Sequence, residues 1–211
     1  MPLVRVELFE RRLTPELESR LIDSLTEALL ETLEAPELRS HTWVIVAVGP
    51  AFGDALRETI GGIPHEEVLR QICAGIEEEG VRYRVVRIAR TSDVAFIAHD
   101  GAQLAGSGIA IGLQSKGTTV IHRADLQPLD CLELFGMAPL LTLESYRQIG
   151  RNAARYANGG RASPVPLVLD NFARAKLIVR TTLLHAREAA EVVPGAAPVE
   201  LALVGSPATA V

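Results

Sequence analysis

One stretch of the chain combines residue types that suit an anionic or amide-rich ligand. It runs from Gly106 to Arg123, where two short apolar runs, Ile109–Leu113 and Thr119–Ile121, flank a polar turn. The turn holds Lys116, one of two lysines in the chain, beside glycine and hydroxyl residues. Glycine lets backbone amides approach a ligand closely, and a compact ammonium and small hydroxyls add further donors. The sequence therefore predicts a strand, a turn and a strand, with Lys116 either as an anion contact or as the solvated lysine of a plain hairpin.

The common nucleotide-binding patterns do not fit this stretch. The P-loop pattern requires a lysine that follows its last glycine, whereas Lys116 precedes Gly117. The dinucleotide fingerprint requires glycines that open a helix, whereas Gly106, Gly108 and Gly112 lead into a predicted strand. These residues alone thus leave two interpretations open, a plain hairpin and an edge that binds an anion or a cofactor.

Other groups that could do chemistry are few. Asp93 could act as a general base, although an aspartate that follows Thr91 and Ser92 is more typical of a helix N-cap. Lys116 would be a candidate catalyst only if buried. The histidines lack metal-ligand spacing, so no zinc site is expected, and the sequence has no serine or cysteine nucleophile elbow. The histidines are His41, His65, His99, His122 and His185.

Strands and helices alternate around these residues. The expected elements are a strand at 43–48, a helix at 66–79, a strand at 81–88, a short helix from 94 to about 104, and the hairpin. This alternation predicts an α/β fold with a Rossmann-like parallel or mixed sheet and flanking helices. The continuous apolar run Trp43–Val48 predicts a strand buried on both faces. Ligands of such folds gather at the carboxyl ends of strands, so Asp93 and Lys116 should share one edge.

Four parts are expected along the chain. They are an N-terminal β-α-β arm at 1–43, an α/β core at 44–138, a helical extension for subunit contact at 139–192, and a mobile tail at 193–211. The extension should hold one helix from Pro139 to Tyr156 and another from about Asp170 to Ala190. The first helix carries a tyrosine and three arginines at near-helical intervals, as a face for a partner subunit or as a solvated charged face. These residues are Tyr146, Arg147, Arg151 and Arg155.

Composition argues against several classes of protein. The net charge of −5 and the lack of a basic run argue against nucleic acid as a partner. The sequence has no stretch of about 18 uncharged apolar residues and no signal-peptide pattern. We therefore expect a cytoplasmic protein without a membrane partner. The two cysteines should be reduced thiols, and Cys73 should pack within a helix rather than react.

Four segments together resemble the medium subunit of adenosylcobalamin-dependent propanediol and glycerol dehydratases. They are Thr91–Phe96, Gly106–Gly108, Gln114–His122 and Leu140–Ala157. The resemblance runs from about Val44 to about Val193. The small subunit of the reactivating factor for these enzymes shares part of the central region and is the alternative. It would lack a segment like Leu140–Ala157, which favours the enzyme subunit.

The resemblance implies a lyase that converts a 1,2-diol into an aldehyde and water by a radical mechanism. A large barrel subunit would hold the substrate and the upper face of the corrin. This chain would cover the lower face and the nucleotide tail of base-on adenosylcobalamin, and the catalytic residues would lie on the large subunit. The implied partners are the large and small dehydratase subunits and the reactivating factor.

Three residues match cofactor contacts of that family. Lys116 matches the lysine that meets the phosphate of the nucleotide tail, and Arg174 matches an arginine near the same tail. Asp93 matches an aspartate near the corrin side chains, whose amides need acceptors as well as donors. Ser115 and Thr118, in the same turn as Lys116, are further predicted contacts.

Three other positions depart from the family pattern. Cys131 stands where an asparagine is expected, Gly136 where a serine is usual, and Leu177 where a tyrosine is usual. Three polar contacts with the cofactor would thus be missing. We expect their loss to alter the affinity for cobalamin or the preferred cobalamin variant.

The N-terminus resembles the first half of a 4-oxalocrotonate tautomerase. The similar residues are Met1–Arg12 and Thr42–Ile45, with the helix between them. In that family Pro2 acts as a base once the initiator methionine is removed, and an arginine, here Arg12, binds the substrate carboxylate. The second half of a tautomerase is absent, so an arm without activity is expected and a working tautomerase is the alternative.

The same arm carries leucines at four-residue intervals from Leu17 to Leu33. Some relatives use an amphipathic N-terminal helix to enter a protein-shelled bacterial microcompartment. The leucine stripe could serve that purpose, and packing against the sheet is the simpler alternative.

Overall fold

The computed structural model describes residues 43–165, 167 and 170–201. The chain divides into two compact units, Met1–His41 and Thr42–Val211, and the described residues belong to the second. Pro2, Arg12 and the Leu17–Leu33 stripe therefore lie outside the described residues, and their roles stay predictions.

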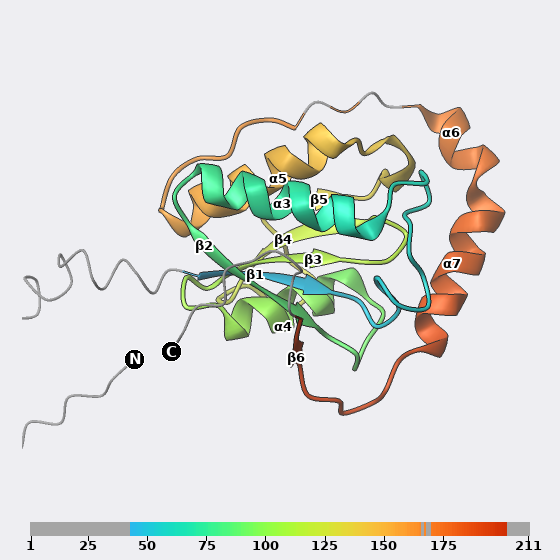
Figure 1. Cartoon of the computed structure of the whole chain (residues 1–211), viewed down its shortest axis with the longest axis horizontal. Coiled ribbons are helices and arrows are strands. Elements are labelled where there is room, and N and C mark those ends of the chain that lie inside the picture. The colour runs from blue at the N-terminus through green and yellow to red at the C-terminus, as the bar shows by residue number, and fades with distance from the viewer. Residues whose placement is uncertain (1–42, 166, 168–169, 202–211) are drawn as a thin grey trace, which may run out of the picture. The chain divides into compact units, whose positions relative to one another are not determined.

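The centre of the described unit is a six-stranded sheet with the strand order β5-β4-β3-β1-β2-β6 (Figure 1). Its strands are β1 (Trp43–Val48), β2 (Arg82–Arg87), β3 (Ile109–Leu113), β4 (Thr119–Arg123), β5 (Glu133–Phe135) and β6 (Val199–Glu200). β1 runs parallel to β2 and β3, whereas the other pairs are antiparallel. The mixed sheet and the hairpin of β3 and β4 confirm two predictions from the sequence.

Helices cover both faces of this sheet. α3 (His65–Glu78) and α5 (Leu143–Ala157) lie on one face, and α4 (Val94–Leu104) lies on the other (Figure 1). Two further helices, α6 (Asn171–Lys176) and α7 (Ile178–Ala190), follow one another beside the sheet, and a 3-10 turn, η1, spans Ala138–Leu140. The predicted α/β class is thereby confirmed. Of the helices in the described part, none is long and apolar enough to cross a bilayer.

Strand β1 lies at the centre of the core. Val44, Val46 and Val48 pack in a cluster with residues of α3 and α5, whereas Ile45 and Ala47 pack in a second cluster with residues of α4. All five side chains are at most 1% exposed. The prediction of a strand buried on both faces is confirmed, because a continuous apolar run is what two covered faces require.

α3 and α5 cross with their backbones in contact. A Cβ atom added at Gly150 would lie 2.1 Å from the carbonyl oxygen of Ile72, and one added at Gly75 would lie 2.1 Å from that of Arg147. No side chain fits in either gap. This pair of glycines therefore sets how closely the two helices approach.

The arginine face of α5 binds α3. Arg147 and Arg151 pair with Glu78, and Arg155 pairs with Glu79. The two carboxylates at the end of α3 attract the three guanidinium groups, so these arginines join two helices on one face of the sheet. The role of this face in contact with a partner subunit stays a prediction.

Two predicted helices have different bounds. The helix expected from Pro139 begins later, because Thr142 caps α5 through reciprocal hydrogen bonds with Ser145, which satisfy free amides at the helix start. Pro139 lies instead in η1. The helix expected from Asp170 to Ala190 is divided into α6 and α7, with Leu177 between them.

The tail that was predicted to be mobile from residue 193 contains strand β6. This strand pairs antiparallel with β2, and Arg84 donates two hydrogen bonds, of 2.9 and 2.7 Å, to the Glu200 carboxylate. β2 would otherwise leave backbone groups unpaired along its outer side, and two extended residues satisfy part of that edge. Val199–Glu200 thus pair with the sheet, whereas the mobility of the tail stays a prediction, and residues 202–211 lie outside the described part.

Candidate functional site

The register of the sheet brings several segments to one edge. Val48 at the end of β1 lies beside Arg87 of β2 and Leu113 of β3. Thr119 at the start of β4 lies beside Leu113 and Phe135. The segments that follow β1, β2, β3 and β5 therefore emerge together, at what we call the carboxyl edge.

This carboxyl edge contains a topological switch point. From β1 the chain passes through α3 to β2, and from β2 it returns over the opposite face through α4 to β3. The two connections diverge at the gap between β1 and β3, which is where doubly wound folds bind ligands. Gly49 follows β1 at this gap, and Ser115 follows β3. Asp93 and Lys116 emerge at the same edge.

The turn Gln114–Thr118, called the Lys116 turn below, is held at the peptide groups of Ser115. The Ser115 N–H donates a 2.7 Å hydrogen bond to Glu188 Oε2 of α7. The Ser115 carbonyl oxygen accepts a 2.7 Å hydrogen bond from His65 Nε2 of α3. Two helices far apart in sequence thus fix one residue of the turn from both sides.

His65 is held in one neutral tautomer. Its Nδ1 accepts a 2.9 Å hydrogen bond from the Gly53 N–H, so the proton lies on Nε2, which donates to Ser115. The ring stacks on Phe52 with centroids 3.8 Å apart. Burial lowers the pKa of His65, which keeps the ring neutral. The imidazole therefore links the loop after β1 to the Lys116 turn through one hydrogen bond at each ring nitrogen.

The other carbonyls of the turn are also bound. The Ile60 N–H donates to the Lys116 carbonyl at 3.0 Å, and the Tyr146 hydroxyl donates to the Gly117 carbonyl at 3.0 Å. Gly117 has a φ of +100°, and a Cβ there would lie 2.6 Å from the Tyr146 hydroxyl, so the position requires glycine. With its carbonyls turned toward protein, the turn presents the Lys116 side chain.

Lys116 is half-buried at this edge. Burial lowers the pKa of its ammonium, and attraction to Glu188 and Asp93 opposes that shift. Within the described part of the chain, no side chain forms a hydrogen bond or an ion pair with this ammonium. A half-buried ammonium with free donors is suited to binding an anion.

Asp93 caps α4, as its position after Thr91 and Ser92 predicted. Its Oδ1 accepts hydrogen bonds from the Ala95 and Phe96 amides at 2.8 and 3.3 Å. The side chain is exposed, and its second oxygen is not used by the cap. The buried Gln114 side chain donates to the Ser92 carbonyl, so the loop that carries Asp93 is tied to the Lys116 turn.

The other predicted contacts of the turn are buried. Ser115 is 0% exposed and Thr118 is 7% exposed. Both side chains lie behind the turn rather than on its outer surface. Their predicted role as cofactor contacts stays a prediction.

The remaining predicted positions fall in two places. Gly136 follows β5 at the carboxyl edge and is exposed, whereas Cys131 precedes β5, toward the opposite end of that strand, and is exposed as well. Arg174 belongs to α6, which packs against η1 next to Gly136. Leu177 lies between α6 and α7.

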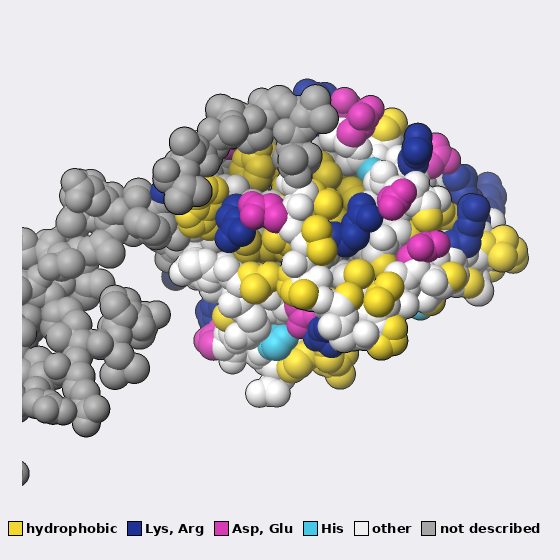
Figure 2. All heavy atoms as spheres, turned by 60° about the horizontal axis from the view of Figure 1, so that its bottom comes forward, with side chains coloured by type: hydrophobic (Ala, Val, Ile, Leu, Met, Phe, Trp, Pro, Cys, Tyr) yellow, Lys and Arg dark blue, Asp and Glu magenta, His cyan; other side chains and the backbone are white. Residues whose placement is uncertain are grey.

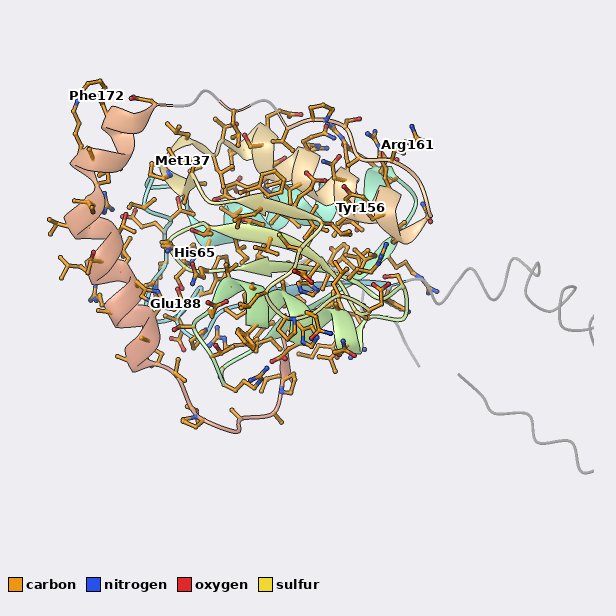
Figure 3. The ribbon with its side chains drawn as sticks, turned by 180° about the vertical axis from the view of Figure 1, so that it is seen from behind. His65, Met137, Tyr156, Arg161, Phe172 and Glu188 are labelled. Atoms are coloured by element: carbon orange, nitrogen blue, oxygen red, sulfur yellow. The ribbon has the colours of Figure 1, made fainter. Side chains whose placement is uncertain are left out.

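Sequence reasoning missed two residues of this site. Figure 3 places His65 and Glu188 on the side of the sheet that faces α7, with Tyr156 and Arg161 on the opposite side. In the sequence His65 is one of several histidines without metal-ligand spacing, and among the described residues no group of three or more metal-ligating side chains exists. Glu188 carries no local signal, because its partner Ser115 is 73 residues away in the sequence.

A separate groove of about 540 Å³ lies between the loop 54–58 and α7. Arg57, Arg180 and Arg187 line it together with Leu183 and Leu184. Lys116 is not part of its lining. Asp54 and Glu58 line it as well, and Glu58 pairs with Arg180, so the groove carries charges of both signs and is distinct from the Lys116 turn.

Two solved structures are distantly similar to this chain. A glycerol dehydratase reactivase has 18% sequence identity and a TM-score of 0.47, with 60% of this chain and 98% of that chain covered. A diol dehydratase-reactivating factor in complex with ADP and Mg²⁺ has 20% identity and a TM-score of 0.44, with 58% and 97% covered. Likenesses this distant carry no argument about activity.

Family models match two parts of the sequence and confirm both resemblances. Residues 2–47 match the tautomerase enzyme family, and residues 49–162 match the dehydratase medium subunit family. The second match covers more than half of the 211 residues and includes Asp93, the Lys116 turn and α5. The chain that presents Lys116 at this carboxyl edge thus belongs to the dehydratase medium subunit family.

Proposed function

We propose that this chain is the medium subunit of an adenosylcobalamin-dependent diol or glycerol dehydratase, which covers the lower face and the nucleotide tail of the base-on cofactor. The Lys116 turn is the observation that carries the proposal. The family match includes it, and its half-buried ammonium lies at the switch-point edge without a hydrogen bond or an ion pair to any described side chain. The phosphodiester of the nucleotide tail needs such a cation.

The residues at this edge carry groups that suit the charge and the amides of the cofactor. Lys116 would bind the phosphate, and the free oxygen of Asp93 can accept a hydrogen bond from a corrin amide. A Cβ added at Gly136 would meet nothing within 4 Å, which leaves room for a bulky ligand. Bound adenosylcobalamin would supply the radical chemistry that converts the diol into an aldehyde and water. This chain would hold the cofactor against a large catalytic subunit.

The outer face of α6 and α7 supports the proposal of a large partner subunit. Phe172, Ile178, Val179 and Leu183 are each at least 60% exposed. Figure 2 shows hydrophobic and basic side chains intermixed at the right end of the described unit, where these helices lie. Exposed apolar side chains that gather on one face mark interaction sites. The small subunit, the reactivating factor and a cytoplasmic location, free or within a microcompartment, belong to the same proposal.

Co-expression with the large and small subunits tests the proposal. The assembled complex should convert propane-1,2-diol or glycerol into an aldehyde only when adenosylcobalamin is added. A complex that assembles fully without this activity would contradict the enzyme function. Reactivation of a damaged dehydratase by this chain with an ATPase partner would favour the reactivating-factor alternative.

Lys116→Ala tests the phosphate contact. A hydrogen bond to a charged group contributes roughly 1.5 to 3 kcal/mol, so cobalamin retention should fall at least about tenfold while assembly is unchanged. Retention is measured by cobalamin absorbance after gel filtration of the loaded complex. Arg70→Ala, which removes an exposed cation of α3, is the control and should retain the cofactor like the wild type.

A second candidate function rests on the tautomerase match over residues 2–47. In this alternative Pro2 is the base and Arg12 binds the substrate carboxylate. Wild-type protein and Pro2→Ala are compared in tautomerisation of phenylpyruvate. Equal rates would exclude the activity, whereas a rate lost with Pro2 would establish it.

A further inference from the structure

Glu188 is the one buried side chain among the residues of α7. It is 2% exposed, while large apolar side chains of the same helix, such as Ile178 and Leu183, face solvent. An amphipathic helix normally buries the apolar residues and exposes the carboxylates, and a buried carboxylate costs free energy unless polar groups compensate it. α7 does the opposite, so this carboxylate is placed for a reason other than apolar packing.

The carboxylate occupies the switch-point gap between β1 and β3. Its Oε2 accepts the 2.7 Å hydrogen bond from the Ser115 N–H after β3. Its Oε1 lies against Gly49 after β1, where an added Cβ would be only 2.1 Å away. This second oxygen has no hydrogen-bond partner within the described residues. The chain thus fills with its own anion the place where folds of this kind bind ligands.

The charges around Glu188 come from three elements. Lys116 of the turn attracts the Glu188 carboxylate, and Asp93 attracts the same ammonium of Lys116. His65 of α3 is neutral and bonded at both nitrogens. On α7 itself Arg187 is exposed, as is Glu191 just beyond the helix end. Burial raises the pKa of Glu188, and the Ser115 groups, the Ala51 backbone and the charge of Lys116 oppose that shift.

We propose that Glu188 is the positioning residue and internal counter-ion of Lys116, and that an anion bound beside Lys116 makes Glu188 take up a proton. The inference rests on the anionic ligand that the proposed function places at Lys116. A second negative charge next to a buried carboxylate favours its protonated form. By linkage, anion binding at Lys116 must then strengthen as pH falls.

The test uses the full chain and sulfate, which stays a dianion from pH 5 to 8, at constant ionic strength. Sulfate affinity is measured from NMR shifts of the Lys116-turn amides in wild type and Glu188→Gln. The glutamine keeps an oxygen for the Ser115 N–H but carries no charge. We expect Glu188→Gln to bind sulfate about tenfold more tightly than wild type at pH 8, with the difference vanishing toward pH 5.

Two controls isolate Glu188. Asp93 and His65 are present in both proteins, so the comparison differs only in the side chain at position 188. Glu191→Gln removes a nearby exposed carboxylate and should behave like wild type. Glu188→Ala, in which the Ser115 amide has no acceptor, should increase amide hydrogen exchange in 178–190, which reports whether Glu188 docks α7.

Parallel pH dependence in wild type and Glu188→Gln would overturn the inference. So would sulfate shifts that are absent from the Lys116 turn or confined to the groove between the loop 54–58 and α7. Failure of the proposed function is detected by a separate measurement, the formation of aldehyde by the co-expressed complex. A Glu188-dependent sulfate affinity in a chain that supports no dehydratase would keep this inference and discard the cofactor assignment.

Discussion

Helices α5 and α7 dock on the same unit by opposite means. α5 lies in backbone contact with α3 and buries Tyr146, Ile149 and Ala153 in the core. α7 buries one carboxylate and leaves its apolar residues exposed. The first contact is apolar and closely packed, whereas the second is polar: Glu188 is buried, and Arg180 pairs with Glu58 at the surface.

This difference separates stability from function within one fold. Burial of apolar side chains stabilises a protein in proportion to the area removed from water, so the α3–α5 contact stabilises the fold. A buried charge brings a desolvation cost that offsets much of its attraction to a partner. The Glu188 contact therefore adds little stability, but it sets the charge beside Lys116. α7, which buries little apolar surface, is the helix that contacts the candidate site.

Gly150→Ala should disrupt the close contact between α3 and α5, and we expect it to have the largest effect on stability. Its Cβ would lie 2.1 Å from the Ile72 carbonyl oxygen, and backbone atoms must move to accommodate it. We expect a loss of about 2 to 3 kcal/mol in the free energy of unfolding, measured by urea denaturation, because overpacking outweighs the gain in helix propensity. Gly61→Ala, whose Cβ would meet only ordinary contacts, should change stability by less than about 0.5 kcal/mol.

Tyr146→Phe tests the one polar contact from α5 to the candidate site. The tyrosine is fully buried, and its hydroxyl donates to the Gly117 carbonyl at 3.0 Å. Thr119 Oγ1 also donates to that carbonyl, so the acceptor keeps a partner. We expect a loss of about 1 kcal/mol in urea denaturation, with NMR shifts concentrated in the Lys116 turn. An unchanged turn would show that α5 supports only the core.

Local patterns predicted the elements that carry their own signal. The apolar run of β1, the hairpin around Lys116 and the Asp93 cap each depend on a few adjacent residues, and the structure contains all three. Burial of Cys73 in α3, which raises the pKa of its thiol to about 12, was visible in the same way from helical spacing. Periodicity reports such features because neighbours in sequence share a face.

Contacts between residues that are distant in the chain could not be predicted from sequence patterns. Nothing near Glu188 distinguishes it from an exposed glutamate, since its burial depends on a backbone amide 73 residues earlier. The contact of Gly75 with α5 likewise depends on a second helix, and each glycine alone resembles a weak point in a helix. The register of two strands decides which loops share an edge, and a single strand does not reveal it.

Glu78→Gln is the mildest probe of the α3–α5 contact. Hydrogen bonds from Arg147 and then Arg151 lower the pKa of Glu78 from an ordinary 4.5 to about 2. Because the pKa is lowered in the folded state, the stabilisation is present above about pH 4.5 and is lost as pH falls toward 2. The pairs are about one-third exposed, so the effect at pH 7 should be small.

The change in stability caused by Glu78→Gln should be recognised by its dependence on pH rather than by its magnitude. Urea midpoints of wild type and Glu78→Gln should differ most at neutral pH and converge between pH 4.5 and 2. Glu77→Gln, on the same helix and exposed, is the matched control and should follow wild type throughout. Curves that stay parallel would mean that the arginine face of α5 adds no pH-dependent stability. The α3–α5 contact would then rest on apolar packing and glycine contact alone, which would widen its difference from the polar docking of α7.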